Sequence, residues 1–311
     1  MNTDDFVIIA GSGSKRLTVR ICEYLGTAPG KSEVIRFSEG NTFVRVLENV
    51  RGRQVYFIQS TVFPANDNFV ELLFYLDALK RASAESVTAI IPYFSYGKGD
   101  KKDEPRVSIR ARVCADAIEA AGADRVVTMD LHAPQIQGFF RIPVDNLYAL
   151  PALCDRIRDE KLKNIIIVSP DAGFVKQARK YASYLKTSVA IADKQRVTHD
   201  EKATVLEIIG DVKDKTAVIV DDFTISGRTL VDVSEKLMER GAKDVYAMVA
   251  HGVLTEGSIE RLDSSPIKRL FFTDTVENHP VKFSEMIEIV PVAHIFGEAI
   301  KRIYNRESIS A

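Results

Sequence analysis

The fold is decided by the stretch Val218-Ile219-Val220-Asp221-Asp222-Phe223-Thr224-Ile225-Ser226-Gly227-Arg228-Thr229. It begins as an apolar strand of the buried type, passes two adjacent carboxylates and a short Ser/Gly turn, and leads into a helical pattern over residues 230–239. Backbone N–H groups in such a turn, and at the start of the helix after it, attract phosphate. Neighbouring side chains on an extended strand point in opposite directions, so at least one carboxylate can reach ribose hydroxyls or a metal. The stretch therefore predicts a strand end that holds a sugar phosphate.

Short β-branched runs alternate with longer amphipathic segments along the rest of the chain. Strands are expected at residues 6–10, 55–60, 86–92, 125–130, 164–169, 188–192, 216–221, 244–249 and 269–273. Helices are expected at residues 14–25, 66–82, 107–121, 148–160, 173–185, 229–240 and 255–261, and residues 290–306 form an amphipathic tail. This alternation predicts an α/β protein with parallel sheets covered by helices on both faces.

The chain divides loosely into two strand–helix series, and its length of 311 residues is typical of about two domains. We expect an N-terminal domain over residues 1–147 and a C-terminal domain over residues 148–290. Each contains a strand that ends in an acidic element, Asp130 in the first and Asp221-Asp222 in the second. The tail, residues 291–311, is expected to pack back on the body of the protein.

Composition excludes several classes of partner. The net charge of -1 does not favour nucleic acid or an acidic membrane surface, and no apolar run approaches the roughly 20 residues of a membrane span. The first residues are acidic and meet a strand-like run, unlike a signal peptide. Three cysteines lie far apart without metal-binding spacing, as expected for reduced core residues. A cytoplasmic protein is the simplest interpretation.

Two acidic strand ends are candidates for a metal or general acid–base site. His132 follows Asp130 at the end of a predicted strand and could ligate a metal or transfer a proton; alternatively it is a hydrogen-bonded loop residue. Asp171 follows Ser-Pro after another predicted strand. It could contact a metal or a sugar, or it could cap the next helix.

Two cationic segments also follow predicted strands. The run from Lys98 to Arg106 could clamp a polyphosphate, and Lys194-Gln195-Arg196 could close over a transferring group. Each could instead be a solvated loop. Together with the phosphate loop and the Asp-Leu-His element, these segments predict phosphoryl or diphosphoryl transfer between a nucleotide and a phosphosugar. Such a transfer needs positioning of the substrates, Mg²⁺ and positive charge.

At this point the chain resembles the ribose-phosphate diphosphokinase family, also called phosphoribosyl pyrophosphate (PRPP) synthases, over nearly its whole length. The most specific match is Asp130-Leu131-His132-Ala133-Pro134-Gln135-Ile136-Gln137-Gly138-Phe139-Phe140, with further matches at residues 66–82, 100–106 and 119–126. The resemblance implies transfer of the β,γ-diphosphoryl group of ATP to the anomeric hydroxyl of ribose 5-phosphate, with release of AMP. It also implies two phosphoribosyltransferase-like domains, an active site between them, and a C-terminal helix that joins the first domain.

The resemblance assigns roles to individual positions. His132 and Asp171 match metal and active-site residues, with Mg²⁺ as the expected cofactor, and Lys194 and Arg196 match the cations of a mobile catalytic loop. The predicted ribose 5-phosphate site consists of Asp221, Asp222, Ser226, Gly227, Arg228 and Thr229. The predicted ATP site consists of Phe37, Glu39, Asn41, Lys98, Gly99, Asp100 and Lys102. Its adenine-side segment, residues 37–41, comes from a neighbouring subunit in the family, which implies a homo-oligomer, a dimer or a hexamer.

Several positions depart from the family pattern. Ile225 and Arg228 replace an Asp and a Gly of the sugar loop, and Lys98-Gly99 replaces Arg-Gln in the ATP loop. Glu39-Gly40-Asn41 replaces Asp-Gly-Glu, and Phe174 replaces a Gly. An active synthase is the first interpretation. The alternatives are a non-catalytic regulatory homologue, a related enzyme with another diphosphoryl donor or phosphosugar, and a phosphoribosyltransferase that uses a nucleobase.

Overall fold

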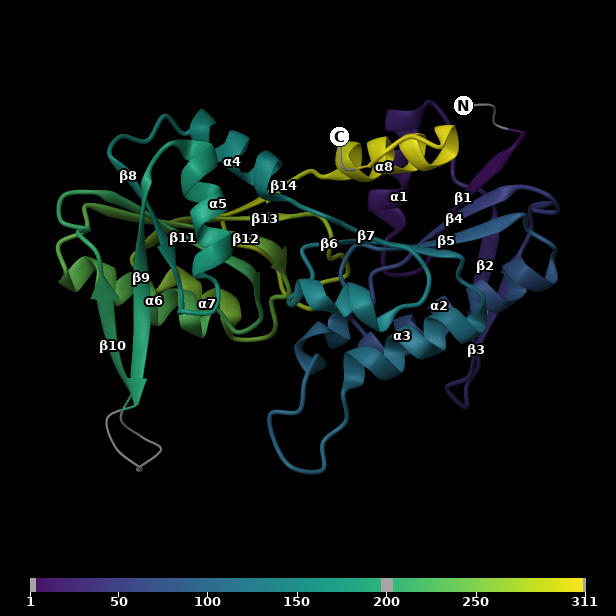
Figure 1. The fold of residues 1–311 in the computed structure, drawn as a ribbon, viewed down its shortest axis with the longest axis horizontal. Coiled ribbons are helices and arrows are strands. Elements are labelled where there is room, and N and C mark those ends of the chain that lie inside the picture. The colour runs from purple at the N-terminus through teal and green to yellow at the C-terminus, as the bar shows by residue number, and fades with distance from the viewer. Residues whose placement is uncertain (1–3, 197–203, 310–311) are drawn as a thin grey trace. The chain divides into compact units, whose positions relative to one another are not determined.

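The computed structural model describes residues 4–196 and 204–309, with the backbone alone for residues 194–196 and 204–206. The chain forms two compact units (Figure 1). Unit 1 comprises Met1–Tyr148, Asp274–Asn278 and Val292–Ala311, and unit 2 comprises Ala149–Thr273 and His279–Pro291. A five-residue segment that the sequence places in the second half, Asp274–Asn278, therefore folds with unit 1.

Unit 1 is built on a parallel sheet with the strand order β1-β4-β5-β6-β7. Its strands are β1 (Phe6–Ala10), β4 (Gln54–Ile58), β5 (Ser86–Ile91), β6 (Arg125–Met129) and β7 (Val144–Leu147). The central strands are buried along nearly their whole length, because helices cover both faces. Since the strands run in one direction, the loops after β5 and β6 leave from the same edge of the sheet.

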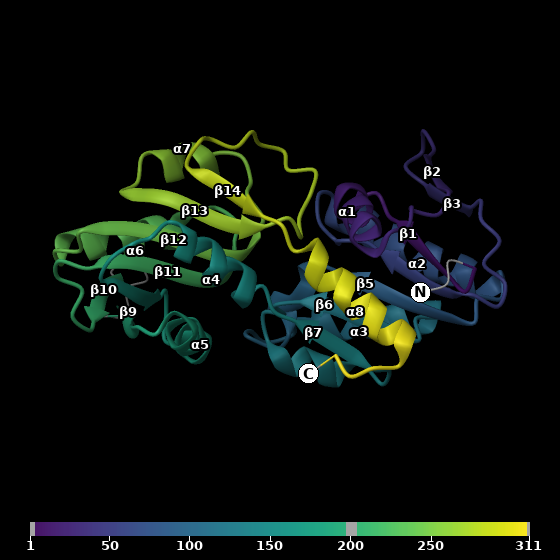
Figure 2. The same ribbon diagram turned by 90° about the horizontal axis from the view of Figure 1, so that it is seen from above.

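Two helices cover each face of this sheet. Helices α1 (Lys15–Leu25) and α8 (Ala293–Asn305) pack on one another over one face (Figure 2). Helices α2 (Ala65–Arg81) and α3 (Arg110–Ala121) cover the other, where Phe57 of β4 stacks on Tyr75 of α2 with ring centroids 4.5 Å apart. Two 3₁₀ turns, η1 (Ser95–Gly99) and η2 (Pro134–Phe139), follow β5 and β6.

An antiparallel hairpin extends unit 1 beyond its main sheet. It pairs β2 (Ser32–Arg36) with β3 (Thr42–Val46), and β3 packs against α2. The hydroxyl of Tyr75 donates to the carbonyl of Glu33, 3.3 Å away, which attaches β2 to the same helix.

The segment Asp274–Asn278 ties the two ends of unit 1 together. The buried carboxylate of Glu277 accepts the backbone N–H of Leu17 at 2.6 Å and of Arg16 at 3.1 Å, at the start of α1. The carboxylate of Asp274 accepts the guanidinium of Arg20 at 2.7 Å and the backbone N–H of Val292 at 2.9 Å. Helix α1 has no side-chain cap of its own and no acidic residue in its first turn, so a residue far along the chain supplies the negative charge that a helix start favours.

Unit 2 is built on a sheet with the order β10-β9-β8-β11-β12-β13-β14, parallel except for β10, which runs antiparallel to β9. Its strands are β8 (Ile165–Ser169), β9 (Ser188–Arg196), β10 (Thr204–Ile209), β11 (Thr216–Thr224), β12 (Asp244–Gly252), β13 (Ile267–Thr273) and β14 (Ile287–Val290). Strand β11 lies between β8 and β12, so the carboxyl ends of β8 and β11 are neighbours.

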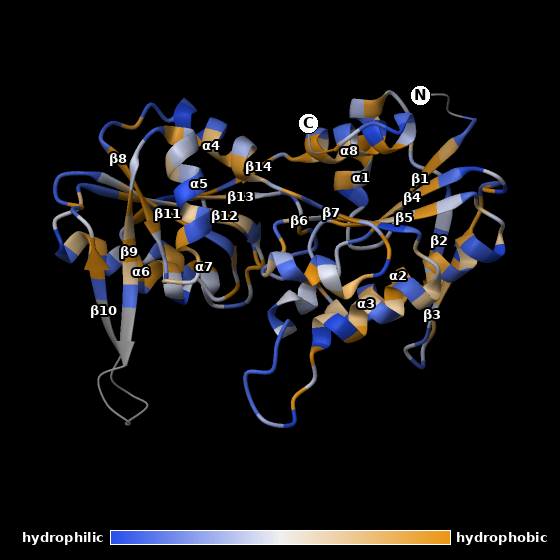
Figure 3. Cartoon of the chain, in the orientation of Figure 1, coloured by the Kyte–Doolittle hydropathy of each residue, from blue (hydrophilic) through white to orange (hydrophobic). Residues whose placement is uncertain are grey.

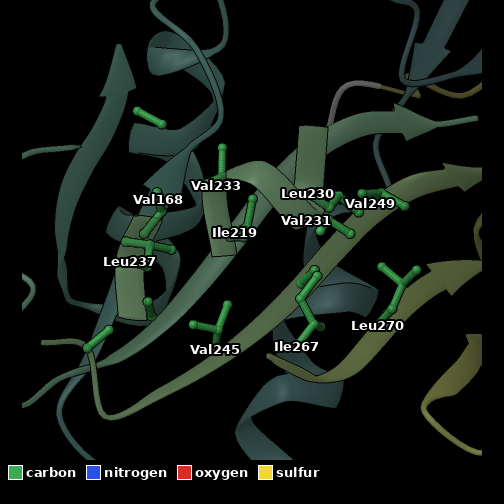
Figure 4. Packing of buried hydrophobic residues seen from close by; sticks show 14 of the residues in the cluster. Val168, Ile219, Leu230, Val231, Val233, Leu237, Val245, Val249, Ile267 and Leu270 are labelled. Atoms are coloured by element: carbon green, nitrogen blue, oxygen red, sulfur yellow. The ribbon is translucent and has the colours of Figure 1, made fainter. Parts of the chain in front are cut away.

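Helices α4 (Leu150–Asp159) and α5 (Val175–Leu185) cover one face of this sheet, and α6 (Arg228–Glu239) and α7 (Ser258–Asp263) cover the other (Figure 1). The core beneath α6 is aliphatic: Leu230 and Leu237 of the helix meet Ile219, Val245 and Leu270 of the sheet (Figure 4). The central strands are the most hydrophobic segments of the chain (Figure 3), and their burial holds the end of β11 in a fixed position.

All of the strands expected from the sequence are present, and the prediction of parallel sheets flanked by helices is confirmed. The strands β2, β3, β7, β10 and β14 were not expected. The burial patterns of β2, β3, β7 and β14 are mixed, without the continuous apolar run that marks a central strand. Strand β9 extends to Arg196 rather than 192, because its outer half pairs with β10.

The cysteines match the expectation of reduced core residues. Cys22, Cys114 and Cys154 are free and buried. Burial raises the pKa of the Cys114 thiol to about 11, and that of Cys22 and Cys154 to about 12, so these thiols are inert core groups. Among the described residues, no helix has both the length and the hydropathy that crossing a membrane requires.

Candidate active site

Carboxylates gather in unit 2 where β8 and β11 end. Asp221 and Asp222 are consecutive residues of β11, and both are half-buried. The carboxylate of Asp221 accepts the backbone N–H of Asp222 at 3.0 Å, and that of Asp222 accepts the N–H of Phe223 at 2.9 Å. Asp171 follows β8, the neighbouring strand, and is exposed.

The electrostatics of this group favour a positively charged ligand. Desolvation raises the pKa of Asp221 well above its usual range, and the charges of Asp222 and Asp171 raise it further. Within the residues that the structure describes, no group of three or more His, Cys, Asp or Glu side chains could hold a metal ion by itself. The carboxylates at this strand end still suit Mg²⁺, because Mg²⁺ usually takes one or two carboxylates and completes its octahedron with water and substrate phosphates.

The Ser/Gly turn after β11 leads into the uncapped start of α6. Gly227, with a φ of 72°, is the residue before the helix and offers no side-chain cap, and the backbone N–H of Arg228 donates to Ser226 Oγ at 3.4 Å. A side chain at Gly227 would be strained at that φ, and its Cβ would lie 3.0 Å from Leu262 Cγ. Ser226 and Arg228 are exposed, and Thr229 is half-buried. The Ser226 hydroxyl, the start of α6 and the exposed guanidinium of Arg228 are together suited to a phosphate.

Two residues that support this turn were not found from the sequence. The guanidinium of Arg261 donates to the carbonyl of Ser226, and the backbone N–H of Thr255 donates to the carbonyl of Ile225 at 3.3 Å. Both lie around α7, about thirty positions later in the chain, as the separations of 35 and 30 residues show. No local motif marks them, because their role depends on α7 packing beside α6.

Asp171 makes a hydrogen bond of the kind that the helix-cap interpretation predicts, although the residue directly before α5 is Phe174. The Oδ1 atom of Asp171 accepts the N–H of Phe174 at 2.9 Å, just before α5 begins. The backbone of Lys194 and Arg196 lies on β9, paired with Leu206 and Thr204 of β10. The side chains of these two cations lie outside the described residues, so their catalytic role stays a prediction.

In unit 1 the signature element and the basic loop are in contact. His132 is exposed after β6, and a Cβ built on Gly97 of η1 would lie 3.5 Å from its Cβ. The amide of Gln135, in η2, donates to the carboxylate of Asp100 at 3.4 Å. The structure therefore brings η1, which contains Lys98 and Gly99, beside His132, and Asp100 beside η2, while Lys102 is an exposed residue further along the loop.

The predicted adenine-side residues lie at the tip of the β2–β3 hairpin. Phe37, Glu39 and Asn41 are exposed, and the turn is closed by the N–H of Phe37, which donates to the carbonyl of Asn41 at 2.9 Å. The amide of Asn41 donates to the carboxylate of Glu39 at 3.2 Å. The ring of Phe37 is 47% exposed, so it is available to a ligand or another subunit.

Comparisons with known proteins identify relatives of the whole chain. A family model described as the N-terminal domain of ribose phosphate pyrophosphokinase matches residues 6–122, and a phosphoribosyl synthetase-associated domain model matches residues 195–311. The chain is 44% identical to a ribose-phosphate pyrophosphokinase of Clostridium tetani over 306 residues, which is 97% of this chain and 95% of that protein. It is 46% identical to the one from Caldanaerobacter subterraneus over 309 residues, which is 99% of this chain and 98% of that protein.

A solved structure has the same fold. The crystal structure of phosphoribosylpyrophosphate synthetase from Mycobacterium smegmatis matches with a TM-score of 0.92 at 34% identity, over 97% of this chain and 99% of that chain. This match confirms the predicted fold class. Because sequence identity of this level spans nearly the whole chain, the protein belongs to the ribose-phosphate pyrophosphokinase family.

Proposed function

We propose that this chain transfers the diphosphoryl group of ATP to the anomeric hydroxyl of ribose 5-phosphate, giving PRPP and AMP for nucleotide biosynthesis. The observation that carries the proposal is the identity of 44–46% with ribose-phosphate pyrophosphokinases along their full length. The residues of the predicted ribose 5-phosphate and ATP sites lie in unit 2 and unit 1.

Ribose 5-phosphate binds in unit 2. Its phosphate meets the turn Ser226, Gly227, Arg228 and Thr229, and its ribose hydroxyls donate to Asp221 and Asp222. The hydrogen bonds that Arg261 and Thr255 donate to carbonyls of the turn support this assignment, because they fix the turn before the ligand arrives.

ATP binds in unit 1, on the loop with Lys98, Gly99, Asp100 and Lys102 beside His132. The contact of η1 with the signature element supports this assignment. Phe37, Glu39 and Asn41 of a second subunit complete the adenine side, so the enzyme works as a homo-oligomer, a dimer or a hexamer. The exposed ring of Phe37 at the hairpin tip supports that role.

His132 and Asp171 would hold Mg²⁺ together with oxygens of ATP, and the ion would neutralise phosphate charge and make the phosphorus more electrophilic. Desolvation first, and then the charges of Asp222 and Asp171, raise the pKa of Asp221, which supports a cation near these carboxylates. Three free, buried cysteines support a reducing, cytoplasmic location.

The transfer step follows from these positions. The anomeric oxygen attacks the β-phosphorus in line. The bond from the β-phosphorus to the oxygen that bridges it to the α-phosphorus breaks, and AMP leaves with that oxygen. The hydroxyl proton passes to solvent. Asp221 and Asp222 orient the sugar, while Lys194 and Arg196 stabilise the charge that develops on the transferred oxygens.

The test is AMP release by the purified chain with ATP and Mg²⁺, in the presence and absence of ribose 5-phosphate. We expect AMP and PRPP to appear in equal amounts only when ribose 5-phosphate is present. Replacing ATP by GTP or CTP checks the donor. A chain that binds ribose 5-phosphate without forming AMP would instead be a regulatory homologue, and PRPP consumption with a nucleobase would identify a phosphoribosyltransferase.

A further inference from the structure

Gly99 leaves room for an arginine that comes from a different element. A Cβ built on Gly99 would lie 2.7 Å from Nε and 2.8 Å from Cβ of Arg110, the first residue of α3. Contacts this short do not occur, so any side chain at residue 99 would displace the arginine and the start of the helix. The Arg110 side chain therefore lies directly across the backbone of η1, where an ordinary residue 99 would begin its own side chain.

The charge of Arg110 has no counterpart within the described part of the chain. The side chain of Arg110 forms no hydrogen bond or ion pair with the residues that the structure describes, and Arg110 is exposed. By contrast, Arg112 on the same helix pairs with Asp116 at 2.6 Å and donates to the carbonyl of Phe139 at 2.7 Å. One guanidinium on α3 is thus fixed by the protein, and the other is available.

Arg110 stands at the start of a helix, where a positive charge without a negative partner is unfavourable. Helix α3 has no side-chain cap and no acidic residue in its first turn. A cation at the first position of a helix opposes the positive end of the helix dipole. The unpaired guanidinium and the uncapped helix start add their positive charge at one place, which a phosphate would balance.

The loop that carries this contact is the predicted ATP loop. Gly97 approaches His132, Gly99 approaches Arg110, and Lys98 is the single residue between them. Lys98 carries a point charge, whereas the flat guanidinium of an arginine can bind a phosphate through two hydrogen bonds. Arg110 places a guanidinium beside the same turn.

We propose that the guanidinium of Arg110 binds the phosphate chain of ATP, and that Gly99 is the residue that gives it access. The inference rests on the proposed function for the identity of the nucleotide. Arg110 is then a phosphate-binding residue of this chain in addition to the positions that the family resemblance assigns.

The test is equilibrium binding of α,β-methylene-ATP, an analogue whose α–β bridge resists the transfer, to the full-length chain with Mg²⁺. Arg110→Ala is expected to weaken binding about tenfold or more, as for the loss of a charged hydrogen bond. Arg110→Met, which keeps the apolar stem, should behave like Ala, and Arg110→Lys should fall in between. Because the contact is to the phosphates, AMP binding should change much less than binding of the triphosphate.

The matched control is Arg81→Ala, which removes an exposed guanidinium from unit 1 whose partner is Asp77 on its own helix. It should bind the analogue like the parent. Unchanged binding by Arg110→Ala, full binding by Arg110→Met, or equal weakening by the control would each overturn the inference. If the parent makes no AMP yet binds the analogue through Arg110, the proposed function fails and this inference stands. If the parent makes AMP and the variants bind normally, the inference alone fails.

Discussion

The contact of Glu277 with the start of α1 gives the sharpest stability prediction. Replacing Glu277 by Ala removes the acceptor of two backbone N–H groups, those of Leu17 and Arg16, in a place where the carboxylate is 5% exposed. The helix has no other side-chain cap. The Leu17 N–H is buried and would lose its partner, whereas the Arg16 N–H can reach water.

The expected cost follows from these contacts. A buried N–H without a partner costs about 1–3 kcal/mol, and the exposed one costs less. Loss of the negative charge at the helix start adds roughly 0.5–1 kcal/mol. The ion pair with Arg16 adds little, since that side chain is 70% exposed. We expect Glu277→Ala to lower the free energy of unfolding of unit 1 by about 3 kcal/mol, or the Tm by roughly 6–12 °C.

The assay is urea unfolding followed by circular dichroism, with amide hydrogen exchange to localise the change. The amides of Leu17 and Thr18 should exchange much faster in the variant, while those of the β11 core in unit 2 should not change. Glu277→Gln keeps one acceptor and should lose about 1 kcal/mol. Glu256→Ala, which removes an exposed carboxylate from unit 2, is the control and should match the parent.

A loss below about 0.5 kcal/mol in Glu277→Ala would refute this reasoning, because surface substitutions commonly reach that size. Equal loss of protection in unit 2 would also contradict it, since the contact would then not belong to unit 1 alone.

Three further predictions concern the chemistry. Asp221→Asn should weaken ribose 5-phosphate binding measured by calorimetry, yet stabilise the ligand-free fold. The pKa of Asp221 is raised from 3.8, so the folded state keeps a proton that the unfolded chain releases. The gain in the free energy of unfolding, measured by urea titration, should therefore grow as the pH rises from about 4 and vanish below it. Lys194→Ala should lower kcat by orders of magnitude with little change in the Kd for ribose 5-phosphate; near-normal turnover in a coupled AMP assay would exclude the predicted role. Removal of Mg²⁺ with EDTA should abolish AMP formation, and adding Mg²⁺ back should restore it; turnover that survives chelation would contradict the assignment of the metal.

The sequence predicted the parallel sheets because the central strands are continuous apolar runs. Residues 216–220 and 247–249 are buried, and strands covered by helices on both faces hide such runs from water. Asp221 and Asp222 follow the buried run, but the predicted end at residue 221 was too early: β11 continues to Thr224, because its outer part still pairs with β12. The hairpin of β2 and β3 escaped prediction because its strands are short and half-exposed, so packing on α2 rather than local pattern stabilises it.

The candidate site divides in the same way. His132, Asp171 and the Ser226–Thr229 turn are local motifs, each set by a few neighbouring residues. Other residues contact the site from separate elements, and no local sequence motif marks them. They are Arg261 and Thr255, which bond the turn after β11, and Arg110, which lies against Gly99. The sequence left two interpretations of Asp171 open. In the structure its carboxylate accepts the N–H of Phe174 before α5, and its role toward Mg²⁺ stays a prediction.

The sequence by itself thus determined the sheets, the strand-end motifs and the family, because burial of apolar runs and the chemistry of short loops depend on residues that are close in the chain. Only the tertiary structure decided which distant residues complete them. The capping of α1 by Glu277, the support of the phosphate turn by Arg261 and the passage of Arg110 over Gly99 all depend on separate elements packing together. Such contacts join residues up to 261 positions apart, and no periodicity within one segment can encode them.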